Sequence, residues 1–341
     1  GLLLEQRDVW LFRDGKPFGA GMQHIASTIL PPLPTVIQGA IRSHQLVLNH
    51  VDLTNKKEIA DHVGTTWDLK SHKIVAGPFI VMEEDGNFER YFPLPADGYS
   101  PEPKTSPCLV RPCSLPVKLD SNRQKSNISS QLHVLGTGDQ PQKGEGDLWL
   151  KETDLLKYLM GKSVKGIKTD QLFNTEFRTG NAIDSATKTT REGFLYQINF
   201  VRMRKKVSLW VGFDAGAEWQ EPGILRFGGE GHAASYKPLA LSPLPIPDGD
   251  ISHKFKVYFA TPAYFSDGWQ PGGGNWSKFF TGKVKLTAAA IGRYLSSGGF
   301  SHETDSHKES LRYVPAGSVY YFECEEDHVR FRPAPLTENH P

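Results

Sequence analysis

The sequence is poor in cysteine and lacks long hydrophobic runs. Three cysteines among 341 residues are an odd number, which argues against a disulfide framework, and no second pair of ligands accompanies them to build a zinc site. No apolar run reaches the roughly 18–20 residues of a helix that spans a bilayer. The leucines at positions 2–4 are too few for the core of a signal peptide. The sequence therefore predicts a protein of the reducing cytoplasm without a membrane anchor.

An excess of either charge is also missing, since 39 basic residues stand against 38 acidic ones and the formal net charge is +1. A protein that binds nucleic acid on its own usually has a clear basic excess, so composition alone does not favour that class. Any contact with RNA must depend on local basic groups, and the acidic surface elsewhere is available to protein partners.

Motifs of the common enzyme classes are absent as well. The chain contains no Walker loop, dinucleotide fingerprint, HExxH or GxSxG sequence. Glu83 and Glu84 are adjacent in a predicted hairpin, where neighbouring side chains point to opposite faces, so they are poor ligands for a two-metal site. His24 follows a glycine-rich turn and could act as a general base for RNA cleavage, although such a histidine is more often a polar loop side chain. We predict no catalytic residue, no metal and no cofactor.

Hydrophobic spacing predicts a chain of strands with a few helices. A strand over 2–12 should end in a turn at Asp14-Gly15, because glycine accepts a positive φ without steric cost. A helix is expected over 35–48, with Thr35 and Gln38 as a capping box. The other predicted elements are a hairpin over 78–92, a helix over 153–160, a second hairpin with arms at 194–200 and 207–213 and a basic run at 202–206 as its tip, and strands over 255–260, 284–291 and 319–322.

The order of these elements indicates the fold class. Strand, helix, hairpin, helix and strand in the first half match a ferredoxin-like (RRM-like) βαββαβ unit, and a second, degenerate copy could fill the rest. Residues 97–147 show no sustained period and are rich in polar residues, Pro and Gly, which indicates a long insertion or a mobile loop. The prediction is an α+β protein with two ferredoxin-like domains, over 1–190 and 191–341, and long loop insertions.

Several stretches taken together resemble one known family. In sequence order they are VWLFRDGKPFGAG, ILPPLPTVIQGAIRS, FRTGNAIDSATKTTREGFLYQINFVRM, ILRFGGEGH, VYFATPAYFSDGW, KLTAAAIGR and VPAGSVYYFEC. In this order they are similar to the Cmr subunit three family, which belongs to the RAMP superfamily of CRISPR proteins. The resemblance covers nearly the whole chain except residues 97–147.

The resemblance implies two ferredoxin-like domains of the RAMP type and a role in antiviral defence, within a type III-B CRISPR (Cmr) effector complex. Such a subunit binds the 5′ repeat-derived tag of the crRNA and bridges the large polymerase-type subunit (Cas ten family) to the first backbone RAMP subunit. It meets target RNA only indirectly, and family members of this kind are regarded as non-catalytic. Two alternatives remain. One is a metal-independent CRISPR endoribonuclease of the same superfamily with His24 or His232 as base, and the other is a structural bridge that touches protein alone.

Basic and glycine-rich loops are the candidate RNA-binding sites, because Lys, Arg and backbone N–H groups in such turns bind phosphates. The first loop follows the first predicted strand, and its alternative interpretation is a tight turn with an internal ion pair. The second surrounds the polar segment 179–190, which is otherwise an exposed linker, and the last two are otherwise structural turns. The candidates in these four groups are Arg13, Lys16, Gly19, Gly21, His24 and Arg42; Arg178, Lys188 and Arg191; Arg226, Gly228, Gly229 and His232; and Gly317 and Ser318.

Two further features have both a structural and a functional interpretation. The run 202–206 is the densest basic cluster, which is usually a solvated hairpin end but could contact RNA or an acidic partner. Trp269 and Trp276 lie in a glycine-rich segment, where core packing is the default and a partner interface is the alternative.

Overall fold

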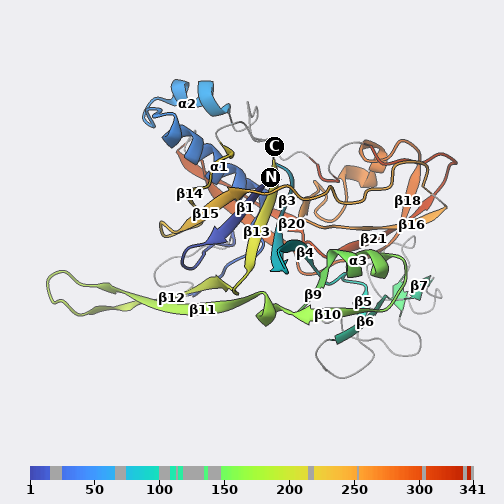
Figure 1. The fold of residues 1–341 in the computed structure, drawn as a ribbon, viewed down its shortest axis with the longest axis horizontal. Helices are drawn as coiled ribbons and strands as arrows, with labels where there is room; N and C mark the ends of the chain where they lie inside the picture. Colours follow the sequence, from blue (N-terminus) through green and yellow to red (C-terminus); the bar gives the residue numbers. More distant parts are fainter. Residues whose placement is uncertain are drawn as a thin grey trace. The chain divides into compact units, whose positions relative to one another are not determined.

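A computed structural model describes residues 1–15, 25–65, 74–99, 108–112, 114–117, 134–136, 147–213, 219–251, 253–301, 305–332 and 336–338 (Figure 1). Strands dominate this part of the chain, which contains the helices α1 (Pro34–Leu48), α2 (Lys56–Val63) and α3 (Glu152–Leu159). The predicted α+β class is therefore confirmed. None of the described helices is both long enough and apolar enough to cross a membrane.

The chain folds into two compact units, and each is assembled from three separate segments. Unit 1 consists of Gly1–Arg90, Asp170–Leu241 and Ser296–Leu311. Unit 2 consists of Tyr91–Thr169, Ser242–Leu295 and Arg312–Pro341. The predicted division at 190/191 and the assignment of two ferredoxin-like domains stay predictions.

Unit 1 is built on an antiparallel sheet, and one of its central strands is buried along its whole length. The strands are β1 (Leu2–Gln6), β3 (Ile74–Glu84), β4 (Asn87–Pro93), β13 (Val207–Phe213), β14 (Gly223–Arg226) and β15 (Ala233–Pro238). They lie in the order β14-β15-β1-β13-β3, continued by the first residues of β4. All seven residues of β13 are buried, and so are the three leucines of β1, which explains why neither strand shows polar alternation in the sequence.

Helix α1 occupies the predicted span but begins differently. Its N-cap residue, Leu33, makes no side-chain hydrogen bond, and Pro34 opens the helix with a φ that already suits it. The predicted capping box is therefore wrong, and the Oε1 atom of Gln38 instead accepts a hydrogen bond from the backbone N–H of Ile74 at 3.3 Å. Ile37, one helical turn before a second buried isoleucine, is fully buried, as the apolar spacing predicts.

The hairpin predicted over 78–92 is present as β3 and β4. Its turn contains Asp85 and Gly86 with φ values of 49° and 82°, the left-handed region that a two-residue Asp-Gly turn requires. The short helix predicted over 153–160 is also present, as α3, and Gly161 follows its end with a φ of 82°.

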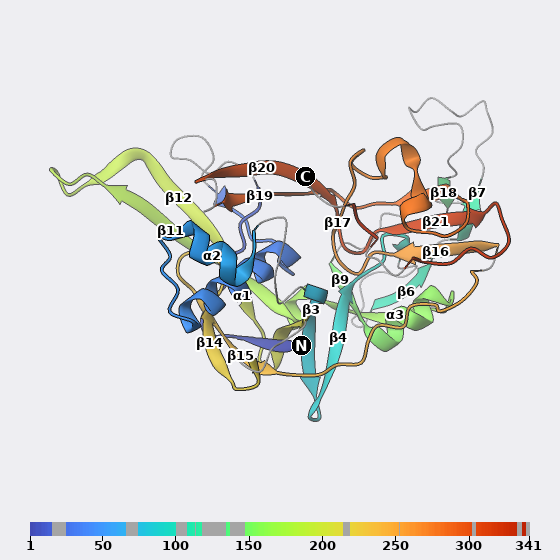
Figure 2. The same ribbon diagram turned by 90° about the horizontal axis from the view of Figure 1, so that it is seen from above.

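The second predicted hairpin is wrong. Its first arm belongs to β12 (Thr190–Met203), which pairs with β11 (Phe173–Ile183) and with the short strand β2 (Ile25–Ala26). Its second arm is β13, which pairs instead with β1 and β3. The chain does turn at Arg204–Lys206, but the strands on either side enter different sheets. The long β11–β12 ribbon that replaces the predicted hairpin is the yellow-green pair of strands in Figures 1 and 2.

Unit 2 contains short strands from distant parts of the chain. They are the last residues of β4, then β5 (Gly98–Tyr99), β6 (Cys108–Pro112), β7 (Ser114–Val117), β8 (Val134–Gly136), β9 (Leu148–Lys151), β10 (Val164–Lys168), β16 (Lys254–Tyr258), β17 (Ala263–Tyr264), β18 (Val284–Ala290) and β21 (Val319–Cys324). One sheet has the order β4-β9-β10-β6-β5 and another the order β16-β21-β18. Apart from Asp97 and Asp147 at its two ends, the described parts of segment 97–147 are strands, and Val110 of β6 is completely buried. Strands β19 (Leu295–Ser301) and β20 (Ser306–Val314) cross the boundary between the segments of the two units.

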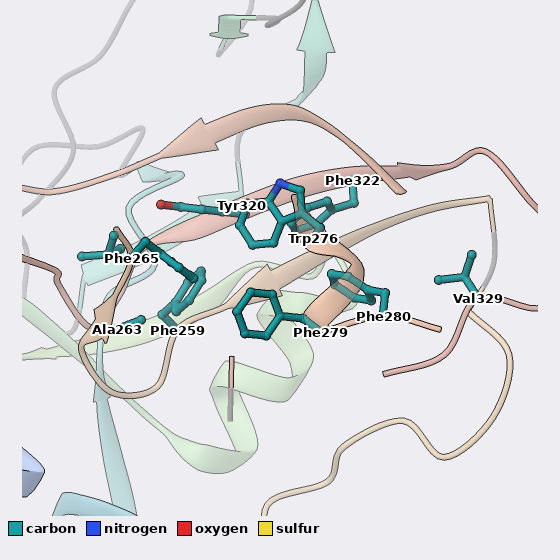
Figure 3. Packing of buried hydrophobic residues seen from close by; sticks show 10 residues of the cluster. Phe259, Ala263, Phe265, Trp276, Phe279, Phe280, Tyr320, Phe322 and Val329 are labelled. Atoms are coloured by element: carbon teal, nitrogen blue, oxygen red, sulfur yellow. The ribbon is translucent and has the colours of Figure 1, made fainter. Parts of the chain in front are cut away.

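The core of unit 2 is aromatic (Figure 3). Trp276 is 5% exposed, and its ring packs edge-on against Phe322 with centroids 4.9 Å apart. Such edge-to-face pairs add about 0.5–1.5 kcal/mol to the burial of each ring. Core packing, the default interpretation of Trp276, is therefore confirmed, and Trp269 packs against the same cluster.

Candidate nucleic-acid interface

The segment after β1 leaves the main sheet and crosses to the β11–β12 ribbon. Trp10 pairs with Val201 through two backbone hydrogen bonds of 2.9 and 2.8 Å, so the strand predicted over 2–12 is broken after Gln6. Arg13 is exposed and forms an isolated bridge with Thr28. Lys16, Gly19, Gly21 and His24, predicted as RNA ligands, lie outside the described residues.

The glycine-rich turn 227–232 packs directly on this crossing segment. The backbone N–H of Gly229 donates a 2.8 Å hydrogen bond to the carbonyl of Leu11. Gly228 has a φ of 87°, and a Cβ atom added to it would lie 2.8 Å from the same carbonyl oxygen. The protein backbone alone therefore requires a glycine at this position, whatever its role toward RNA. Arg226 precedes the turn in β14 and is exposed.

Five charged or titratable side chains from four chain segments meet beside this turn. We call Asp8, Glu176, Arg178, Arg202 and His232 the two-arginine cluster. Glu176 Oε1 lies 2.8 Å from Arg178 Nη2, and Glu176 Oε2 lies 2.6 Å from Arg202 Nε. Asp8 Oδ1 lies 3.7 and 3.4 Å from the Nη2 atoms of the same two arginines. The Nδ1 atom of His232 lies 3.8 Å from Asp8 Oδ2.

The cluster is accessible to solvent and electrostatically balanced. The side chains of Arg178 and Arg202 are 43% and 47% exposed, and that of Glu176 is 32% exposed. Hydrogen bonds from Arg202 and then from Arg178 lower the pKa of the Glu176 carboxyl, and the same carboxylate raises the pKa of Arg202. Two cations and two anions therefore face each other on a surface that a ligand can reach.

The aromatic ring of Phe200 packs against two members of the cluster. The guanidinium carbon of Arg178 lies 5.0 Å from the centre of the Phe200 ring, a cation–π distance. The His232 ring meets Phe200 edge-on, with centroids 5.3 Å apart. The structure thus brings two predicted residues, Arg178 and His232, to one place, and adds Asp8, Glu176 and Phe200, which the sequence did not single out. Arg202 was noted only within the basic run, although Phe200 and Arg202 share a face of one strand by their spacing of two.

The rest of the second predicted group lies farther along the same ribbon. Half of the polar loop predicted over 179–190 is strand, since β11 runs to Ile183 and β12 begins at Thr190, and residues 184–189 form the turn between them. The carboxylate of Asp184 accepts hydrogen bonds from the backbone N–H groups of Ala186 and Thr187 and closes the turn. Lys188 follows in this turn with a φ of 58° and is exposed. Arg191 belongs to β12.

The opposite face of the ribbon exposes apolar side chains. Phe177, Leu195 and the neighbouring Ile25 of β2 are 61%, 58% and 55% exposed. The pairing of Phe177 with Asn199 and of Gln197 with Ile25 places them on the face that does not carry Arg178. One ribbon therefore presents cations on one face and exposed apolar groups, including an aromatic ring, on the other.

The remaining candidates make structural contacts elsewhere. Arg42 Nη2 donates a 2.8 Å hydrogen bond to the carbonyl of Gly64 and so ties α1 to the end of α2. Gly317 and Ser318 belong to unit 2, where Gly317 has a φ of 91° and the Ser318 hydroxyl donates to the Pro315 carbonyl at 2.8 Å. Across the described ranges, no group of three or more His, Cys, Asp or Glu side chains is placed to hold a metal ion.

Comparisons with known proteins agree with the sequence motifs. Residues 2–338 match a family model described as CRISPR-associated protein (Cas_Cmr3). Two chains of solved structures are similar to this chain, with 18% sequence identity and TM-scores of 0.51 and 0.50. Each match covers 94% of this chain, and the matches cover 85% and 86% of the solved chains. They come from cryo-EM structures of the Type III-B Cmr-beta bound to cognate target RNA, the first also with AMPPnP. No curated protein matches the chain. Because the family model spans almost every residue, the chain belongs to the Cas_Cmr3 family of CRISPR-associated proteins.

Proposed function

We propose that this chain is a non-catalytic, RNA-binding subunit of a type III-B Cmr complex and that it holds the 5′ repeat-derived tag of the crRNA. The observation that carries the proposal is the β11–β12 ribbon, which combines exposed arginines with exposed apolar side chains in a chain of this family. Similar chains occur in assemblies that contain cognate target RNA. Sequence-tolerant binding of single-stranded RNA needs both kinds of group.

The chemistry of the ribbon fits the two parts of a nucleotide. Arginine guanidinium groups bind phosphate oxygens through charge-assisted hydrogen bonds, which Arg178 and Arg202 are placed to make. Unstacked bases pack on exposed rings and apolar side chains, which Phe177 and Leu195 supply on the other face. A strand of RNA that reaches the ribbon can therefore be held by its backbone on one side and by its bases on the other.

The same proposal includes contacts with protein partners, namely the large polymerase-type subunit and the first backbone subunit. Val47 and Leu48 at the end of α1 and Leu53 beyond it are 61%, 45% and 60% exposed. Exposed apolar side chains this close in the sequence supply the kind of patch that marks a protein interface. We assign this patch to an interface with one of these two subunits, and the β11–β12 ribbon to the interface with RNA.

We also infer that the sheet of unit 1 is of the ferredoxin-like type. Between β1 and β3 lies α1, and the antiparallel order β15-β1-β13-β3 places the third and fourth strands of such a unit on either side of β1. The segment from β4 to β12 is then a long insertion between the second and third strands. This interpretation keeps the predicted fold for unit 1 but takes its strands from different parts of the sequence.

The absence of catalysis is part of the proposal. Of the two histidines considered as a general base, His24 lies outside the described residues. The side chain of His232 is only 14% exposed, and its ring packs against Phe200. Incubation of the purified chain with repeat RNA should give no cleavage at a defined site. Site-specific cleavage that disappears on His232→Ala would replace the proposal with the endoribonuclease alternative.

The decisive experiment uses the assembled complex. Crosslinking of the crRNA should yield adducts between the tag and residues 173–203 of this chain, and Arg178→Ala should weaken tag binding by about 1–3 kcal/mol. Arg330→Ala is the matched control, because Arg330 is also an exposed arginine paired with a carboxylate, but in unit 2. A tag that crosslinks only to other subunits, together with unchanged binding in Arg178→Ala, would favour the purely structural bridge.

A further inference from the structure

The Glu176 carboxylate occupies the centre of the two-arginine cluster. Its Oε1 atom accepts hydrogen bonds from Arg178 Nη2 and Nε at 2.8 and 3.0 Å, so this pair is two-pronged. Its Oε2 atom accepts a third hydrogen bond from Arg202 Nε at 2.6 Å. One carboxylate therefore binds two guanidinium groups at once.

A phosphodiester would use the same donors in the same way. Both anions spread one negative charge over two oxygens, and the planar guanidinium fork matches either of them. Both arginines are more than 40% exposed, so an RNA backbone can approach them without opening the protein. Glu176 is thus an anion held by the donors that a phosphate would use.

The acidic residues also set the field that RNA meets. Asp8 and Glu176 together cancel the formal charge of Arg178 and Arg202, and a phosphate that added to this cluster would meet two carboxylates within 4 Å of the guanidinium groups. At the same time the carboxylates separate two like charges and hold the guanidinium groups in place. The two guanidinium groups are therefore placed to bind an anion, but the Glu176 carboxylate is already bound to them.

We infer that Glu176 is an internal competitor in a two-arginine phosphodiester site, and that RNA binds the ribbon by displacing it. The inference rests on the proposed RNA-binding function and adds how that binding is controlled. RNA that is free in solution competes poorly with a carboxylate tethered beside the arginines. RNA that an assembled complex holds at high effective concentration displaces it. The cluster then favours guide RNA already seated in the complex over unrelated RNA.

The test compares Glu176→Gln with the wild-type full chain. Binding of a short labelled single-stranded RNA is measured by fluorescence anisotropy at low salt. Glutamine keeps the size of the side chain and removes its charge, so the variant should bind RNA about three- to tenfold more tightly, the size expected for two exposed ion pairs. Addition of Arg202→Ala to this variant should abolish the gain.

Glu5→Gln is the matched control. Glu5 is an exposed carboxylate of the same unit, paired with Lys237 at 2.9 Å, and its neutralisation changes the net charge of the chain by the same amount. It should leave RNA binding unchanged. Circular dichroism and thermal unfolding of each variant confirm that the fold is kept.

The outcomes separate the inference from the proposed function. If Glu176→Gln binds RNA no more tightly than the wild type, including the case in which neither binds, the inference is overturned. If Glu5→Gln gives the same gain, the effect is one of net charge and the inference is overturned as well. The proposed function fails separately, when Arg178→Ala and the crosslinks in the assembled complex show no contact with the tag.

Discussion

The ring of Tyr196 lies across the β11–β12 ribbon directly over Gly180. The two residues are partners in the strand register, and a Cβ atom added to Gly180 would lie 2.3 Å from Cζ of the tyrosine. The ring covers a position where the opposite strand has no side chain. It therefore fixes the local register of a ribbon that is otherwise only two strands wide along much of its length.

Gly180→Ala should loosen the ribbon. Alanine normally stabilises a strand by about 0.5–1 kcal/mol relative to glycine, but here the new methyl group must displace the Tyr196 ring. Gly166→Ala in β10 is the control, since its Cβ would make an ordinary 3.4 Å contact with Leu148. Hydrogen exchange should quicken over 177–197 in the first variant and slow around β10 in the second. Equal slowing at both sites would contradict the tyrosine contact.

Gly39→Ala should stabilise α1. Gly39 is exposed in the helix interior, and a Cβ atom there would meet nothing within 4 Å. The expected gain is about 0.5–1 kcal/mol in the free energy of unfolding, measured as slower amide exchange in α1. The same variant also tests whether RNA approaches Gly39 closely. If it does, the added methyl group should weaken RNA binding.

Asp97→Asn should destabilise unit 2. The Asp97 carboxylate is completely buried and accepts hydrogen bonds from the hydroxyls of Tyr158 at 2.9 Å and Tyr321 at 2.5 Å. It also lies 3.4 Å from Lys256 Nζ, whose side chain is 16% exposed. Removal of the anion leaves a nearly buried cation without its anionic partner, which should reduce stability by about 2–4 kcal/mol.

Hydrogen exchange in β21 measures this loss, because Tyr321 belongs to that strand. The control is Glu323→Gln, which breaks an exposed ion pair with Lys254 and should change stability by less than about 1 kcal/mol. Similar protection of β21 in both variants would show that the Asp97 ion pair contributes no more than a surface pair.

The hydrogen bond between Asp250 and His328 should raise the pH at which His328 loses its proton. His328 Nδ1 lies 2.7 Å from Asp250, and this hydrogen bond raises the pKa of His328 above its usual range. A raised pKa in the folded chain means that the pair stabilises the fold fully below the pKa of the unfolded histidine. This contribution is lost as the pH rises through the higher, folded-state value. It should be small, because His328 is highly exposed.

Proton NMR of the histidine rings checks this prediction. His328→Gln identifies the resonance, and Asp250→Asn should lower its titration midpoint while the other histidines keep theirs. An unchanged midpoint in Asp250→Asn would mean that the hydrogen bond is not formed in solution.

Local signals in the sequence predicted local structure well. The apolar spacing of Ile37 and Ile41 predicts α1, and Asp85-Gly86 predicts the turn between β3 and β4, because both depend on residues a few positions apart. The pairing of β12 was wrong for the complementary reason. Two alternating segments joined by a short turn predict a hairpin. Instead, β13 pairs with β1 and β3, and all seven of its residues are buried there. Pairing between distant strands leaves no mark in a short window of sequence.

The candidate site was predictable only in part. Arg178 and His232 were chosen from basic and glycine-rich segments, and the structure brings them together. The acidic half of the two-arginine cluster was missed, because nothing near Asp8 in the sequence indicates that Glu176 lies beside it. The composition allows such pairing, since 38 acidic residues stand against 39 basic ones, but it does not indicate which of them meet.

The position of β13 in the sheet of unit 1 has a consequence for how the protein is made. Leu2 pairs with Val211 on one side and with Pro238 on the other, so both neighbours of β1 are synthesised more than 200 residues after it. At about 5–20 residues per second, a ribosome needs roughly 10–40 s to supply them. During that interval three consecutive leucines remain without their partner strands, and an exposed apolar segment of this kind is prone to aggregation.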